Sequence, residues 1–301
     1  MTDTTNSRYL AGALYGLSAI LIWAGWMSVT RLGISTSLTA ADITMLRFGT
    51  AGILLLPVVI RHGLGLARLR WWQLAIMVGG AGAPYAMIAS SGLRYAPAAD
   101  AGVLIPGVMP LFVAILAVTL LGEKIGASRK AGYGMILLGV LAIAGMAVLV
   151  PGQRTIGHAL FLTASFMWAG YTIVLRRAGL APLHAAALVS VGSGIIFLPF
   201  YVWLRGTALA TVPMNDILLQ AVFQGVFATI LSLYLFGKTV ALLGASGGAA
   251  FGALVPALAA LLAIPVLGER PSVTDWLGIA SVTAGVYLAS GGPVRWIRPR
   301  S

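Results

Sequence analysis

Six side chains that can form hydrogen bonds or stack on a small molecule lie inside long apolar stretches of the sequence. Tryptophan and tyrosine offer a flat apolar ring with one polar group, whereas serine and glutamine offer hydrogen-bond donors and acceptors. Because polar groups in lipid need partners, such residues either bond to a neighbouring helix or face a wet cavity. Both interpretations stay open. The candidates for a central cavity are Trp23, Tyr85, Trp168, Gln224, Ser232 and Tyr234.

Two of these candidates, Trp23 and Trp168, occur in two copies of one short motif. Trp23 begins the letters WAGW and Trp168 begins the letters WAGY. A tryptophan in the middle of a membrane helix packs on lipid or on another helix, or it forms the wall of a cavity with one N–H donor. The duplication favours the cavity role. Trp276, by contrast, lies at a span edge, where an aromatic residue is expected at the headgroup level.

Arg47 is the one clear ionisable residue within an apolar span. It can snorkel to the membrane surface, pair with Asp42 or bind lipid headgroups. No Asp or Glu lies in the middle of a span, which argues against proton coupling through a central carboxylate. A polyanionic substrate would require clustered Lys or Arg. A neutral, zwitterionic or lipophilic substrate therefore fits the sequence better.

The composition indicates an integral membrane protein. Of 301 residues, 59% are hydrophobic and 9% are charged, and the mean hydropathy is +0.98, whereas soluble proteins carry roughly 25% charged residues. The apolar runs are continuous and lack the alternation of an outer-membrane barrel. Because the first run, near Leu10, is followed by further spans, we expect a membrane helix there and not a cleaved signal peptide. Ten spans are expected, at about 10–30, 40–60, 72–93, 98–121, 129–149, 156–176, 183–203, 216–240, 245–267 and 272–291.

The basic residues predict the orientation of these spans. If the N-terminus is cytoplasmic, thirteen Lys and Arg lie in inside connections and five lie in outside connections. Because basic residues concentrate on the cytoplasmic side, we predict that both termini are cytoplasmic. The net charge of +12 comes from basic residues scattered through short loops, so we expect no nucleic-acid partner.

Side chains for metal or enzyme chemistry are scarce. The sequence has no cysteine, and His62, His158 and His184 lie far apart near span ends. This pattern excludes disulfides and thiolate sites and gives no metal-ligand spacing. Since a charged catalytic cluster is also missing, we expect no metal, no cofactor and no enzymatic activity. The oligomeric state stays open, and a monomer is compatible with the sequence.

One span occurs twice. The stretch 98–124 carries small or kinking residues at every fourth position and ends in the letters LGEK, and the same design returns 146 positions later, ending in LGER. A face of small residues lets membrane helices approach closely, and prolines bend a helix and free a backbone carbonyl. The face is therefore a packing seam, a cavity lining or both. The matched residues are Ala98 with Gly244, Gly102 with Gly248, Pro106 with Gly252, and Pro110 with Pro256.

The repeat divides the chain into two halves of five spans each, 1–150 and 151–301. Because five is odd, the second half enters the membrane from the opposite side, and the halves are inverted repeats. Such repeats place a binding site near the midplane and permit alternating access. The predicted fold is an all-α membrane protein of ten helices. Within it Pro110 and Pro256, as the matched prolines, are the candidate hinges or gates.

Glu123 and Glu269 close the two copies of the duplicated span, and each precedes a basic residue. A carboxylate at a helix C-terminus is disfavoured by the helix dipole and requires a compensating partner. Each glutamate can form a salt bridge within its loop, cap the following helix or act in a gate at one membrane face. The sequence leaves these three roles open.

The ten spans in two five-helix halves, the duplicated Trp-Ala-Gly motif and the spans that end at Glu123 and Glu269 resemble the drug/metabolite transporter superfamily. The chain is most similar to its EamA-type ten-helix exporters, and more narrowly to YddG-like members, over essentially its whole length. The resemblance implies a multi-pass carrier of the bacterial inner membrane that exports amino acids, aromatic or other neutral ones, or related metabolites. Its partners would be a small-molecule substrate and the lipid bilayer.

Two other functions stay open beside this expectation. One is a multidrug or toxic-compound exporter of the same fold. The other, from a different class, is a structural or regulatory membrane protein that transports nothing. The absence of mid-span carboxylates leaves two modes of transport open. One is facilitated diffusion without coupling, and the other is coupling through water, the backbone or another ion.

Overall fold

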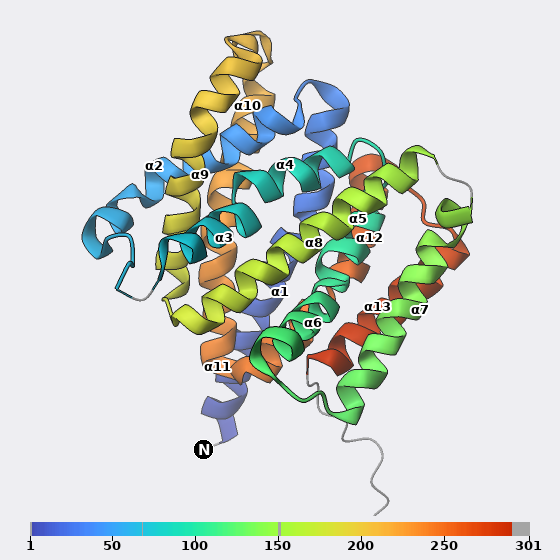
Figure 1. Cartoon of the computed structure of the whole chain (residues 1–301). Coiled ribbons are helices and arrows are strands. Elements are labelled where there is room, and N and C mark those ends of the chain that lie inside the picture. Colours follow the sequence, from blue (N-terminus) through green and yellow to red (C-terminus); the bar gives the residue numbers. More distant parts are fainter. Residues whose placement is uncertain (1, 68, 150–151, 291–301) are drawn as a thin grey trace, which may run out of the picture.

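The chain is built from membrane-length helices. A computed structural model describes residues 2–67, 69–149 and 152–290 (Figure 1). In this part of the chain, eight helical stretches are long and apolar enough to cross a membrane. The shorter apolar helices Val255–Leu267 and Val273–Ala289 bring the crossings to the expected ten. The predicted all-α membrane fold is confirmed.

Several crossings consist of more than one helical element, so the element numbers exceed the number of spans. In the first half the elements are α1 (Thr2–Thr36), α2 (Ala40–His62), α3 (Trp71–Ala81), α4 (Ala83–Gly92), α5 (Ala98–Gly102), the π-helix η1 (Val103–Gly107), α6 (Met109–Leu121) and α7 (Ala127–Leu149). In the second half they are α8 (Gln153–Ala178), α9 (Pro182–Arg205), the 3₁₀ helix η2 (Ala208–Thr211), α10 (Met214–Gln220), the π-helix η3 (Ala221–Leu231), α11 (Ser232–Gly252), α12 (Val255–Leu267) and α13 (Val273–Ala289).

Acidic residues lie in the first turn of several helices. Thr39 and Asp42 form a reciprocal capping box at the start of α2, and Ser272 and Asp275 form the same box at the start of α13. In each box the side-chain oxygens accept hydrogen bonds from backbone N–H groups that lack a partner within the helix. A negative charge there also complements the helix dipole.

The two halves are inverted and interlocked. α1 begins at the lower end of the molecule in Figure 1 and runs upward, whereas α8 runs from the upper right to the lower left. α1 packs mainly against α11 and α12 of the second half, and α8 packs mainly against α3, α4 and α6 of the first. The first helix of each half is thus embedded in the other half. The pairs α2 with α9 and α7 with α13 add further contact between the halves.

Small residues permit the closest helix crossings. A Cβ atom added at Gly102 would lie 2.5 Å from the Cβ of Ala259, so α5 and α12 touch there with no room for a side chain. The α7–α13 pair uses the same device, since a Cβ at Gly139 would lie 2.6 Å from the carbonyl oxygen of Gly278. Gly102 therefore lies in a packing seam between α5 and α12. At Gly248, its match in the second copy, a Cβ would lie 2.8 Å from a side-chain carbon of Val240, a residue of the same helix α11.

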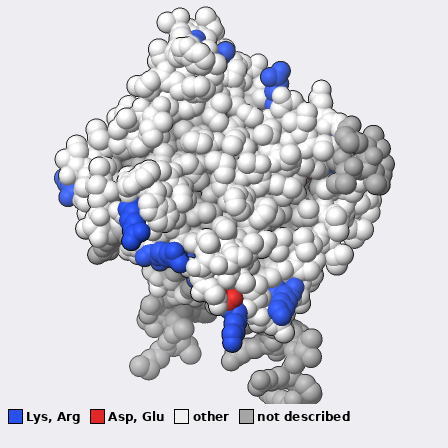
Figure 2. Space-filling model, in the orientation of Figure 1, with Lys and Arg blue, Asp and Glu red and all other residues white. Residues whose placement is uncertain are grey.

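Charged residues are sparse on the surface and gather toward one end. On the face in Figure 2, Lys and Arg are more frequent toward the lower and left edge, near the end where α1 begins, than at the upper end. α13 ends at this same end, as an even number of crossings requires. We call this the inner end and the opposite one the outer end. Its assignment to the cytoplasm stays a prediction from the positive-inside rule.

Candidate functional site

Both copies of the duplicated span end in the same turn, and this turn positions a glutamate. Gly122 after α6 and Gly268 after α12 have φ values of 65° and 69°, a left-handed conformation that glycine adopts without strain. The next residue bonds back to the helix in each case: Glu123 N to Ala117 O at 3.2 Å, and its counterpart Glu269 N to Ala263 O at 3.3 Å. This left-handed cap turns both glutamates off their helix ends.

Each glutamate reaches an arginine of the opposite half. The inner pair joins Glu123 Oε1 to Arg176 Nη2 of α8 at 2.9 Å. The outer pair joins Glu269 Oε1 to Arg31 Nε of α1 at 2.5 Å. Arg31 and Arg176 occupy corresponding positions in the two WAG-containing helices. The inverted repeat therefore produces one contact twice, once near each end of the molecule.

The two pairs differ in burial. In the outer pair the side chains of Arg31 and Glu269 are 27% and 15% exposed, whereas in the inner pair Arg176 and Glu123 are 50% and 38% exposed. Arg31 also donates to the carbonyl oxygens of Leu93, at 2.6 Å, and of Ala96. Burial raises the pKa of Glu269 above its ordinary value, although the charge of Arg31 and backbone N–H groups oppose this.

A second cluster reinforces the outer end. Asp100 of α5 accepts hydrogen bonds from Arg154 of α8, at 2.7 and 2.9 Å, and its Oδ2 lies 2.6 Å from His158 Nε2. Arg154 also lies 3.2 Å from Asp275 of α13. Together these contacts tie α5, α8 and α13 to one another beside the outer pair. The outer end is thus held by buried and part-buried charges from both halves.

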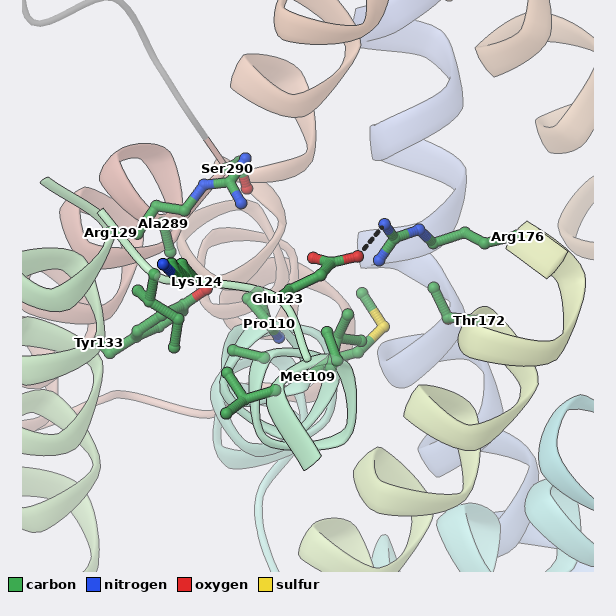
Figure 3. A pocket seen from close by; sticks show the side chains of 15 residues that line it. Met109, Pro110, Glu123, Lys124, Arg129, Tyr133, Thr172, Arg176, Ala289 and Ser290 are labelled. Carbon is green, nitrogen blue, oxygen red and sulfur yellow. Dashed lines mark hydrogen bonds and ion pairs between the residues drawn. The ribbon is translucent and has the colours of Figure 1, made fainter. Parts of the chain in front are cut away.

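The inner end is less enclosed. A cavity of about 250 Å³ lies beside the inner pair. Figure 3 shows Glu123 pointing toward Arg176, with Pro110 and Met109 of α6 on one side and Thr172 of α8 near the arginine. The walls thus come from both halves. The inner pair is therefore more accessible to solvent than the outer pair.

The two repeated tryptophans make matching contacts. Trp168 of α8 meets the ring of Tyr85 in α4 edge-on, with centroids 4.8 Å apart. Trp23 of α1 donates through Nε1 to Ser232 Oγ at 2.9 Å and lies 5.0 Å from the ring of Phe236 in α11. Each tryptophan therefore contacts the third span of the opposite half. Four of the six sequence candidates come together as these two pairs.

Residues 10–145 and 155–291 each match the model of the EamA-like transporter family. The chain belongs to the EamA-like transporter family. Family membership agrees with the predicted drug/metabolite transporter architecture and with a carrier rather than an enzyme. The narrower likeness to YddG-like exporters stays a prediction.

Relatives of the same kind cover most of this EamA-like chain. It is 26% identical to an uncharacterized inner membrane transporter, YedA, of Escherichia coli K12, over 95% of this chain and 94% of that protein. It is 25% identical to a probable terminal-alkyne amino-acid exporter of Streptantibioticus cattleyicolor, over 89% and 90%. The match to the uncharacterized transporter YetK of Bacillus subtilis, at 26% identity, spans 65% of this chain and 61% of YetK.

A solved crystal structure shares the fold of this EamA-like chain. It superposes with a TM-score of 0.59 over 92% of this chain and 96% of that one, at 21% identity.

The two remaining cavity candidates of this EamA-like chain lie elsewhere. Gln224 is fully buried, and its amide donates to Thr30 Oγ1 at 2.9 Å and to Gln220 Oε1 at 3.0 Å. It thus ties η3 to α1, the interhelical role that the sequence also allowed. Tyr234 is 56% exposed, with Lys238 Nζ 5.5 Å from its ring centroid. The structure does not place Tyr234 with the other candidates, because its position on α11 turns it outward.

The matched prolines both lie just after a break in their span. Pro110 stands in the first turn of α6, directly after η1 and Val108, and it lines the inner cavity. Pro256 stands in the first turn of α12 and is buried. Proline suits a first turn because its missing N–H has no helical partner there. The hinge role stays a prediction for both.

The two repeated tryptophans lie outside both the inner cavity and a second, larger groove. The larger groove, of about 870 Å³, runs along α3, α4 and α9, and its lining is apolar apart from Ser193. Trp23 and Trp168 line neither this groove nor the cavity at the inner end. They pack against side chains of the opposite half, and both side chains are only partly buried.

Sequence reasoning missed the partners of the two glutamates. The adjacent bases Lys124 and Arg270 were the nearest candidates along the chain, but the ion pairs go to Arg31 and Arg176 instead. A signal was present, since both arginines recur with the same spacing from the WAG motif. The pairing itself depends on the interlocking of the halves.

Proposed function

We propose that this chain exports neutral amino acids, aromatic or other, or related small metabolites across a bacterial inner membrane by alternating access. The observation that supports this most directly is the matched pair of Arg–Glu contacts. An alternating-access carrier closes one end while the other is accessible. The exposed fractions of 27% and 15% in the outer pair, against 50% and 38% in the inner pair, fit a state closed at the outer end.

The interior chemistry supports a small, weakly charged substrate. Aromatic rings from both halves lie inside the bundle, and the described spans carry no cluster of basic residues such as a polyphosphate would need. The relative from Streptantibioticus cattleyicolor is named a probable terminal-alkyne amino-acid exporter, and an amino acid is a substrate of this class. Amino acids with apolar side chains are therefore the first substrates to test.

Flux into liposomes tests the proposal. The purified protein is reconstituted, and uptake of labelled Trp, Phe, Thr and Met is measured with and without an imposed pH gradient. Saturable flux of at least one amino acid is expected, and a dependence on the gradient would identify protons as the coupling ion. Absence of saturable flux for every compound, with the protein correctly inserted, would contradict the proposal.

The roles of the tryptophans provide a sharper test within the same assay. Trp23→Ala and Trp168→Ala should each lower transport about tenfold or more, since each removes a large aromatic wall. Trp276→Ala is the matched control and should change transport by less than about twofold, because this residue is expected at the headgroup level. Equal losses in all three variants, at equal expression, would remove the tryptophans from the pathway.

Two alternatives give different outcomes. A multidrug exporter of the same fold would move lipophilic toxic compounds and not amino acids in the liposome assay. A structural or regulatory membrane protein would move neither. Growth rescue of cells poisoned by an excess of one metabolite separates the carrier from the non-transporting class.

A further inference from the structure

Arg47 is a buried cation within the membrane-spanning region. It lies seven residues after the start of α2, roughly 10 Å along the helix at 1.5 Å per residue. Its side chain is 8% exposed. This burial excludes two roles that the sequence allowed, snorkelling to the surface and binding to headgroups.

The structure also excludes the third role that the sequence allowed, an ion pair with Asp42. Asp42 accepts a hydrogen bond from Tyr201 at 2.7 Å and faces Arg205, whose Nη2 lies 3.2 Å away. These partners come from α9 and occupy both carboxylate oxygens. Within residues 2–67, 69–149 and 152–290, no carboxylate lies within ion-pair distance of Arg47.

The hydrogen bonds of Arg47 leave most of its donors available. Its Nε donates to Thr229 Oγ1 at 3.1 Å, and Thr229 in turn donates to the backbone oxygen of Gln224 at 2.7 Å. A guanidinium has five N–H groups, and Thr229 takes one of them. The side-chain oxygen of Gln224 lacks a partner in the described structure, but a neutral amide oxygen cannot balance a full charge.

Aromatic rings surround the guanidinium. Its Cζ atom lies 5.7 Å from the ring centroid of Trp26 and 5.3 Å from that of Phe48, and it is near enough to Tyr85 for an electrostatic interaction. Trp26 is itself buried, and its Nε1 has no hydrogen-bond partner among the described residues. Tyr85 in turn contacts Trp168. Arg47 therefore adjoins the aromatic pair formed between the halves.

We propose that Arg47 binds the carboxylate of the transported molecule. This rests on the proposed transport function and narrows it to substrates that carry a single carboxylate. The planar guanidinium matches a carboxylate through two parallel hydrogen bonds. An ionisable residue within the membrane is costly and marks a functional position. Its missing counter-ion is supplied by the substrate, and its neighbours offer aromatic rings to an apolar side chain.

A binding measurement tests this inference separately from transport. The thermal stabilisation of the purified wild-type protein is titrated with Phe and with phenylalaninamide, which lacks the negative charge. The titration is repeated with Trp, Thr and Met and their amides. We expect at least one amino acid to bind about 10- to 100-fold more tightly than its amide, the range of one charge-assisted contact. Equal affinities for every acid and amide, or no binding of any amino acid, would overturn the assignment.

Variants then locate the contact at Arg47. Arg47→Gln should lower the affinity for the amino acid about 10- to 100-fold and leave that for the amide within about twofold, whereas Arg47→Lys should keep part of the preference. Thr229→Val retains the charge and removes only its positioning bond, so the preference should survive. An equal loss for acid and amide in Arg47→Gln would overturn the assignment. If Arg47→Gln does not fold, Arg47→Lys provides the test. An acid-over-amide preference that is unchanged in Arg47→Lys would also overturn the assignment, since a guanidinium and an ammonium bind carboxylates differently.

The two proposals fail in different ways. Absence of the acid-over-amide preference in the wild-type protein refutes the role of Arg47 even where amino-acid flux is present. Absence of flux in a protein that binds amino acids with this preference refutes the carrier function and leaves the carboxylate site in place.

Discussion

Replacing Glu269 by Gln removes the charge of the outer pair and keeps the shape of the side chain. Both partners are mostly buried, and Arg31 Nε lies 2.5 Å from Glu269 Oε1. Loss of a close charge-assisted contact in such a setting costs about 1.5–3 kcal/mol. We take about 1.5–2 kcal/mol, because the arginine is still 27% exposed. At 1.4 kcal/mol per factor of ten, the outer end should open about 10- to 30-fold more often.

A cysteine reporter beneath the outer pair measures this opening. Ser28 is fully buried on α1, one turn from Arg31 toward the inner end, and the sequence contains no cysteine that would interfere. In Ser28→Cys, a membrane-impermeant thiol reagent added from the outer side should react about 10- to 30-fold faster once Glu269→Gln is introduced. Thr207→Cys, on the exposed connection after α9, is the control for reagent access.

The inner pair supplies the matched comparison. Glu123 and Arg176 are 38% and 50% exposed, and an exposed pair contributes about 0.2–1 kcal/mol. Glu123→Gln should therefore change labelling by less than about fivefold, and in the opposite direction, because it loosens the other end. The reasoning is refuted if both glutamine variants accelerate labelling equally. It is also refuted if Arg31→Gln adds fully to Glu269→Gln, since partners in one contact must not be additive.

Three further predictions address the rest of the structure. Gly102→Ala places a Cβ 2.5 Å from that of Ala259 and should destabilise the protein by about 1–3 kcal/mol, whereas Gly134→Ala, with nothing within 4 Å, should not, as thermal unfolding will show. Because burial raises the pKa of Glu269, acid should neutralise it at a higher pH than an exposed glutamate. Labelling at the reporter cysteine should then rise as the pH falls in the protein that keeps Glu269, and Glu269→Gln should not show this rise. The same pH dependence in both proteins would mean that the glutamate is not responsible. Tyr234→Ala should leave transport within about twofold, and a larger loss would return this residue to the pathway.

Length and hydrophobicity determine the fold class of this chain from its sequence. About 20 consecutive apolar residues can satisfy their backbone groups in lipid only as a helix, so the ten spans follow from local composition. The repeat around Pro110 and Pro256 and the odd number of spans per half give the inversion without any structure. The glycines that end the duplicated spans mark the turns at Glu123 and Glu269, because glycine readily adopts the left-handed conformation that ends many helices.

What the tertiary structure alone decides is which helix faces meet. The embedding of α1 and α8 in opposite halves pairs Glu123 with Arg176 and Glu269 with Arg31, and no periodicity within one helix contains that information. The same holds for Arg47, because Asp42, one possible partner in the sequence, binds Tyr201 and Arg205 of α9 instead. In lipid every span is apolar on all sides, so the sequence shows little of which side faces a neighbour. The partner of a charge is fixed only when helices from both halves pack around it.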